Sequence, residues 1–152
     1  MKRCGFTLLE VLMVAAGISI LAGITVVAIN PVQQLTRTRN YERLVSVNII
    51  ENAVYSYASD NDGDLPSGIP LGPACLTAVD NEICRDDADD CSGYIDLSVL
   101  TDDQRYLVSF PVDPGVASGS SGTGYRISRN TVGRISTCAP LAEDSEVIEV
   151  MR

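Results

Sequence analysis

The feature that most constrains this 152-residue chain is an apolar run that extends from Phe6 to Ile29 and contains one charged residue, Glu10. At about 1.5 Å per residue, the run is long enough to cross a hydrocarbon layer of roughly 30 Å as one helix. A carboxylate in a membrane helix costs on the order of 2.5–3.5 kcal/mol and is tolerated mainly where it has a partner. Because the run holds no Lys or Arg, Glu10 needs a partner charge from elsewhere.

A partner charge would arise if the chain were cut between Gly5 and Phe6, because Phe6 would then carry a free α-ammonium. The short basic leader with Lys2 and Arg3, the Gly, the segment Phe-Thr-Leu-Leu-Glu and the apolar helix together resemble the type IV pilin and pseudopilin family. The resemblance implies that a prepilin peptidase cleaves after Gly5 and methylates Phe6. It also implies that Glu10 pairs with Phe6 of a neighbouring subunit during filament assembly.

Two other interpretations of the apolar run remain open. The first is a conventional secretory signal cleaved after Ala28, although the run is longer than a usual signal core and Glu10 is unfavourable within it. The second is an uncleaved signal anchor, whose leader charges would keep the N-terminus inside the cell.

The expected organisation has four segments. Residues 1–5 form a leader that is removed, 6–30 a transmembrane or filament-core helix, 31–59 an amphipathic continuation of that helix, and 60–152 a globular head. The formal net charge is −9, from 11 basic and 20 acidic residues. An acidic head disfavours nucleic acid as a partner, because nucleic-acid affinity rests largely on cationic contacts.

Three residues unfavourable to a regular helix lie in or just after the apolar run: Gly17, Gly23 and Pro31. Small residues also let neighbouring helices approach closely. Pilins that this chain resembles partly unwind between such residues when they enter a filament. The resemblance therefore implies weak helicity from about Gly17 to Pro31 in the assembled state.

The segment after Pro31 shows helical periodicity over two neighbouring directions. One apolar set falls within an arc of about 140° at 100° per residue. It consists of Leu44, Val47, Ile50, Val54 and Tyr57. A second set, Tyr41, Val45, Ile49 and Tyr55, lies beside it. This width predicts contact with the protein's own sheet on one side and with other subunits on the other, although complete burial within one domain also fits.

The head is expected to hold an antiparallel sheet made of segments 125–129, 133–138 and 146–150, in which apolar and polar residues alternate. Residues 67–93 are rich in Gly, Pro and Asp and predict an irregular surface region. Residues 97–107 are compatible with a short helix that begins with a capping box at Thr101. The fold class is therefore α+β: a long N-terminal helix packed against a small antiparallel sheet.

Five cysteines occur in the chain, at positions 4, 75, 84, 91 and 138. Loss of the leader would leave four, with three possible pairings. Disulfides are favoured over zinc because the chain has no His and no C-x-x-C spacing. Pilins often close a C-terminal region with a disulfide, and this resemblance implies the pairs Cys91–Cys138 and Cys75–Cys84.

No cofactor is expected, and metal binding is a weak alternative. Asp60, Asp62 and Asp64 alternate as in some calcium loops, but the Gly and Glu of an EF-hand are missing at the required positions. Asp113 is a further weak candidate, because pseudopilins often hold calcium in a C-terminal loop. A membrane-anchored enzyme is disfavoured, because there is no His and no nucleophile motif.

The sequence thus predicts a structural subunit of a type IV pilus, held in the inner membrane as a single-pass precursor with its head outside. Its partners would be other copies of itself, the prepilin peptidase and the pilus assembly machinery. A pseudopilin of a type II secretion or competence system is the alternative. A membrane-anchored binding module is a more remote one, since it leaves the leader and Glu10 unexplained.

Overall fold

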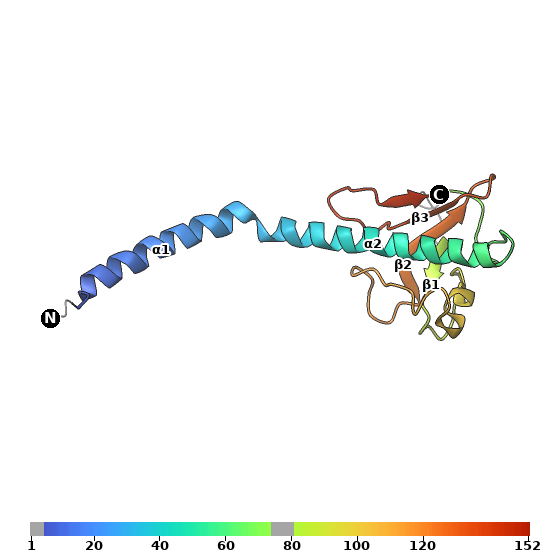
Figure 1. Cartoon of the computed structure of the whole chain (residues 1–152), viewed down its shortest axis with the longest axis horizontal. Coiled ribbons are helices and arrows are strands. Elements are labelled where there is room, and N and C mark those ends of the chain that lie inside the picture. Colours follow the sequence, from blue (N-terminus) through green and yellow to red (C-terminus); the bar gives the residue numbers. More distant parts are fainter. Residues whose placement is uncertain (1–4, 74–80) are drawn as a thin grey trace. The chain divides into compact units, whose positions relative to one another are not determined.

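The computed structural model describes residues 5–73 and 81–152, and the chain divides into two compact units, one ending at Arg37 and one extending from Thr38 to Arg152. The first unit contains α1 (Leu8–Ile29), blue in Figure 1, and the first residues of α2 (Pro31–Asp60). Thr7 caps α1, because its hydroxyl accepts a hydrogen bond from the Glu10 N–H at 3.3 Å. Such a cap satisfies a backbone donor that has no partner within the helix.

The two helices are separated by Asn30, whose backbone is left-handed with φ 46°. Asn tolerates this conformation better than most residues. Pro31 follows as the first residue of α2, where a missing N–H costs nothing because the first turn has no acceptor for it. The sequence Asn-Pro therefore ends one helix and begins the next.

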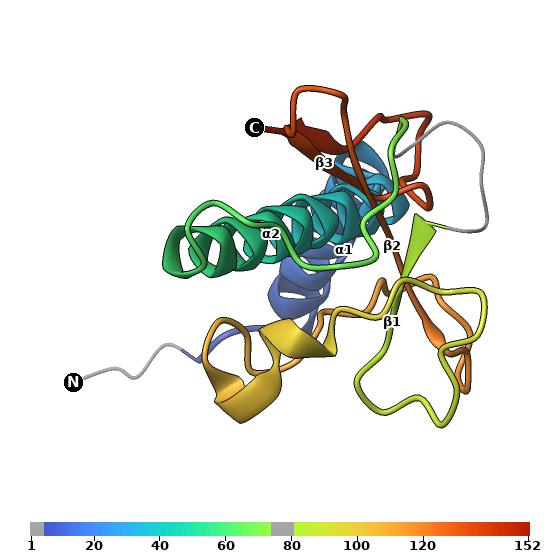
Figure 2. The same cartoon turned by 90° about the vertical axis from the view of Figure 1, so that its right-hand side faces the viewer.

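The second unit is built on a four-stranded antiparallel sheet in the order β1-β2-β3-β4. The strands are β1 (Glu82–Cys84), β2 (Gly122–Arg129), β3 (Ile135–Cys138) and β4 (Glu149–Met151). The part of α2 in this unit lies along one side of β2 and β3 (Figures 1 and 2). The predicted α+β fold class, a long helix packed on a small antiparallel sheet, is confirmed.

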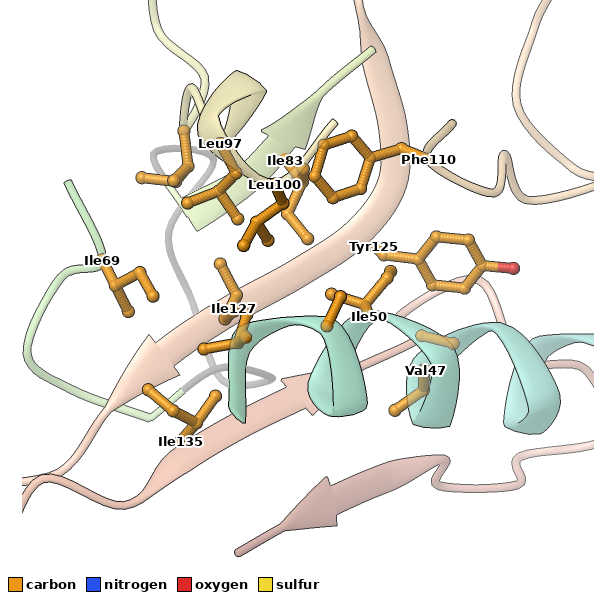
Figure 3. Packing of buried hydrophobic residues seen from close by; sticks show 14 of the residues in the cluster. Val47, Ile50, Ile69, Ile83, Leu97, Leu100, Phe110, Tyr125, Ile127 and Ile135 are labelled. Atoms are coloured by element: carbon orange, nitrogen blue, oxygen red, sulfur yellow. The ribbon is translucent and has the colours of Figure 1, made fainter. Parts of the chain in front are cut away.

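The core fills the space between α2 and the sheet (Figure 3). From α2, Val47, Ile50 and Val54 are fully buried, as their helical spacing predicts. Tyr125 and Ile127 of β2 face them from the sheet. Burying a side chain of this size stabilises a fold by about 1.5–3 kcal/mol, so this layer holds the head together.

Local structure differs from the expectation in two places. β1 lies inside the stretch expected to be irregular. Residues 97–107 form two separate 3₁₀ turns, at Ser98–Leu100 and Asp102–Gln104, instead of one helix. The capping box is wrong, because Thr101 makes no side-chain cap and Asp103 has φ 53°, a conformation that a continuous helix excludes.

The expected disulfide pairs are also wrong. Cys84, at the end of β1, is bonded to Cys91, and the two Cα atoms are 5.6 Å apart. A cysteine forms one disulfide at a time, so this bond excludes both Cys91–Cys138 and Cys75–Cys84. The bond closes a short loop, whereas the expected Cys91–Cys138 pair would have joined distant segments. Cys138 is buried on β3 and also disulfide-bonded, and Cys75 lies outside the described residues.

Candidate functional site

The backbone around the expected cleavage point is exposed and not helical. Residues Gly5 to Thr7 precede α1 without regular structure, and the Phe6 side chain is 81% exposed. A Cβ added to Gly5 would meet nothing within 4 Å. A protease needs an accessible segment, and the bond between Gly5 and Phe6 lies in one that is exposed and not helical.

The surface of α1 is unusual because none of its residues is buried, although nearly all are apolar. Glu10 is exposed on this surface. Phe6 and Glu10 line the same shallow hollow, together with Val11 and Val14. Phe6 and the Glu10 carboxylate therefore lie on the same side of this segment.

By length and composition, α1 can cross a membrane. Its hydroxyl groups fit such a setting, because Ser19 donates to the Ala15 carbonyl at 2.8 Å and Thr25 donates to the Leu21 carbonyl at 2.9 Å. A polar group in lipid is costly unless it finds a partner inside the protein. These two hydroxyls therefore need no partner outside the helix.

The helix-breaking candidates have different positions in the two helices. Gly17 and Gly23 lie within α1, and a Cβ at either would meet nothing within 4 Å. Pro31 begins α2. Helix melting between them concerns the assembled state and stays a prediction.

The exposed side of α2 in the head carries apolar side chains, which we call the α2 stripe: Tyr41, Leu44, Val45 and Ile49. Their exposed fractions range from 40% to 67%. At 100° per residue, Tyr41, Val45 and Ile49 are centred on the side of α2 away from Val47 and Ile50, whereas Leu44 borders the buried face. The prediction that this helix has one face for its own sheet is confirmed, and the second face is open to solvent.

A buried ion-pair cluster fixes two head loops to α2. The Arg43 guanidinium, 1% exposed, donates to both oxygens of Asp113, at 2.8 and 3.1 Å, and to Glu143 at 3.2 Å. Asn40, one turn earlier, accepts from Arg43 at 2.9 Å. The hydrogen bond with Asp113 raises the pKa of Arg43 further above its ordinary value. This cluster ties residues 113 and 143 to one turn of helix.

The weak calcium candidates occupy ordinary polar environments. Both Asp113 oxygens are bound by Arg43, and one also accepts the Gly115 N–H at 2.7 Å. Asp60 accepts from the Arg105 guanidinium at 2.9 Å. Asp62 and Asp64 are exposed in the turn after α2. Within residues 5–73 and 81–152, no group of three acidic, His or Cys side chains could hold a metal ion.

Two buried charged residues of α2 were not anticipated as important: Arg43 and Glu51. A signal for Arg43 was present, because it precedes Val47 by four and Ile50 by seven residues and so belongs to the buried face. A charge in that register indicates a buried partner. The identity of the partners, 70 and 100 residues away, carries no comparable signal in the sequence.

Together these features define an α+β protein with a disulfide-bonded head, a helix packed on a small antiparallel sheet, and an apolar helix able to cross a membrane. No protein-family model, curated protein or solved structure matches the chain.

Proposed function

We propose that this protein is a structural subunit of a type IV pilus. It is stored in the inner membrane through α1, cleaved between Gly5 and Phe6, N-methylated at Phe6 and polymerised through its helices. The observation that carries the proposal is the wholly unburied apolar surface of α1 with a single carboxylate, Glu10, four residues after an accessible Gly-Phe bond. A helix of this kind requires a lipid or protein environment that the head does not supply.

The proposed role of Glu10 is to set the register between subunits. In a bundle of α1 helices, the Phe6 ammonium of one subunit would neutralise Glu10 of the next in a dry environment. Desolvating both ions costs about as much as their attraction returns, so the pair fixes position more than it adds stability. Methylation of the amine keeps its positive charge.

The α2 stripe supplies a second contact for neighbouring subunits. Tyr41, Leu44, Val45 and Ile49 are partly exposed on a helix whose other face is packed. Covering them with a second copy would remove apolar area from water at roughly 25 cal/mol per Å². Apart from the buried Glu51 and Asp113, the described acidic residues of the head are at least partly exposed, where they favour solubility.

The test is a Glu10→Gln variant compared with Glu42→Gln, which neutralises an exposed carboxylate on α2. Filaments sheared from the cell surface are counted by negative-stain electron microscopy, and membrane-fraction protein is measured in parallel. We expect Glu10→Gln to abolish filaments while membrane levels hold, and Glu42→Gln to assemble normally. Normal filaments from Glu10→Gln would show that assembly does not need the pair between Phe6 and Glu10.

Processing is tested separately with Gly5→Ser. We expect this variant to accumulate in the membrane as a precursor that keeps residues 1–5, measured by intact-mass spectrometry. A mature mass in this variant would contradict cleavage at the Gly5–Phe6 bond. If the wild type yields only short periplasmic fibres, the protein is a pseudopilin of a secretion or competence system.

A further inference from the structure

Glu51 of α2 is fully buried, with 0% of its surface exposed. Among the described residues, neither carboxylate oxygen has a hydrogen-bond partner of ordinary geometry. A buried carboxylate without a partner strongly disfavours its charged form. Glu51 thus lies in the layer between α2 and the sheet, where burial favours the neutral, protonated form of its carboxyl group.

The charged group acting on Glu51 comes from the end of the last strand. The charge and backbone of Arg152 lower the pKa of Glu51, but the larger effect of burial raises it, so the net shift is upward. Arg152 also donates to the Asn52 side chain at 2.9 Å and exchanges two backbone hydrogen bonds with Ile135, each 3.1 Å long. These contacts hold β4 and Arg152 against α2 beside Glu51.

β2 and β4 carry further charged residues, Arg126, Arg129 and Glu149, but among the described residues Arg152 is the charge that acts on the pKa of Glu51. On β2, Tyr125 faces the helix, and its hydroxyl bonds to Ser46. β3 (Ile135–Cys138) holds no residue that titrates, since Cys138 is disulfide-bonded. On β4, Glu149 bonds to the Ser136 hydroxyl, on the sheet face opposite the one that Val150 turns to the core.

Among the elements around Glu51, we expect β4 to open most easily. It is an edge strand of three residues, its one partner strand within residues 5–73 and 81–152 is β3, and Glu149 and Met151 are exposed. Short edge elements with few buried side chains open at lower free energy than central ones. Opening β4 would let water reach the Glu51 carboxylate.

We propose that Glu51 makes the docking of β4 on α2 pH-dependent: the strand stays closed while the carboxyl is neutral and opens more often as it ionises. The direction of this pH dependence follows from the direction of the pKa shift of Glu51. Because the closed state raises the pKa of Glu51, its closed-state stability is fully present below the ordinary Glu pKa of about 4.3. It is lost progressively as pH rises to the closed-state pKa and changes no further above it.

The test is hydrogen–deuterium exchange of the full-length protein in detergent micelles between pH 4 and 8. The intrinsic exchange rate is divided out, and peptides covering 148–152 report on β4. We expect the protection factor of β4 to fall by up to about tenfold per pH unit above pH 4.3 and then to level off. Peptides covering β2 should keep constant protection over the same range.

Three variants separate ionisation from tethering. Glu51→Gln should make β4 protection independent of pH, and the control Glu42→Gln should keep the wild-type slope. Asn52→Ala removes the tether to Arg152 but leaves the carboxyl, so it should lower protection equally at every pH and keep the slope. Asn52→Ala leaves the core untouched and tests the tether by itself even if Glu51→Gln does not fold.

Three results would overturn the proposal. The first is β4 protection that does not change with pH in the wild type. The second is a pH slope that persists in Glu51→Gln or disappears in Asn52→Ala. The third is a parallel fall in β2 protection, because the whole head would then be unfolding and β4 would not be a separate device.

Discussion

α1 and the head portion of α2 have the same helical backbone but opposite relations to the rest of the chain. α1 buries none of its side chains, whereas the head portion of α2 buries a fully enclosed row that includes Arg43, Val47 and Ile50. The head is therefore stabilised by its own contacts, whereas α1 gains no such stabilisation from burial of its side chains. This difference predicts that substitutions in the head change folding stability, while substitutions in α1 change membrane residence and assembly.

This difference between α1 and the head can be tested by denaturant unfolding of the full-length protein in detergent micelles. All six tyrosines lie between positions 41 and 125, so near-ultraviolet circular dichroism of tyrosine reports on the head alone. Each variant below is compared with the wild type by this measurement, from the largest expected effect to the smallest.

Arg43→Ala should have the largest effect and lower the free energy of unfolding by about 3–5 kcal/mol, because it leaves the Asp113 carboxylate buried without its cation. Its matched control is Arg105→Ala, which breaks the exposed pair with Asp60 and should cost about 0–1 kcal/mol. Equal losses in the two variants would mean that the Arg43 cluster does not anchor the head.

Ile50→Ala and Ile49→Ala compare the two faces of α2 at adjacent positions. Ile50 is fully buried, and its truncation should lower the free energy of unfolding by about 2–5 kcal/mol. Ile49 is 41% exposed, and its truncation should lower the free energy of unfolding by much less. Ile49→Ala should instead reduce the number of filaments. A large stability loss from Ile49→Ala would show that the α2 stripe belongs to the core.

Replacing Cys84 and Cys91 together by Ser should cost about 2 kcal/mol, because the bond between them closes only a short loop. A non-reduced peptide map provides the direct check and should contain Cys84 linked to Cys91. Recovery of Cys91 linked to Cys138 would contradict the observed pairing.

Leu12→Ala should have the smallest effect on the head, within about 0.5 kcal/mol, because Leu12 is 59% exposed on α1. A shift above 1 kcal/mol would contradict the separation between the two regions.

Local periodicity was sufficient to predict the elements whose contacts follow from residue spacing. The apolar run, the buried positions Val47, Ile50 and Val54, and the antiparallel character of the head all depend on patterns within short windows. Strand ends differ from the expectation by a few residues, since β2 begins at Gly122 and β4 ends at Met151.

The contact partners of individual side chains could not be predicted in the same way. Cys84 has three candidate partners in the head, and the choice of Cys91 depends on the path of the loop after β1. Arg43 meets Asp113 only because the sheet brings a loop 70 residues away onto α2. The same holds for Glu51, whose burial depends on the last strand. Family resemblance also misled the disulfide assignment, because it supplied a pattern where the local chain geometry decides.

The proposed function requires α1 to be the assembly helix of a processed filament subunit. Mass spectrometry of the N-terminal peptide from sheared surface filaments tests it most directly. We expect a chain that begins with N-methylated Phe6, recovered from long fibres. A chain that retains residues 1–5, or one that begins at Ile29 after cleavage behind Ala28, would contradict it.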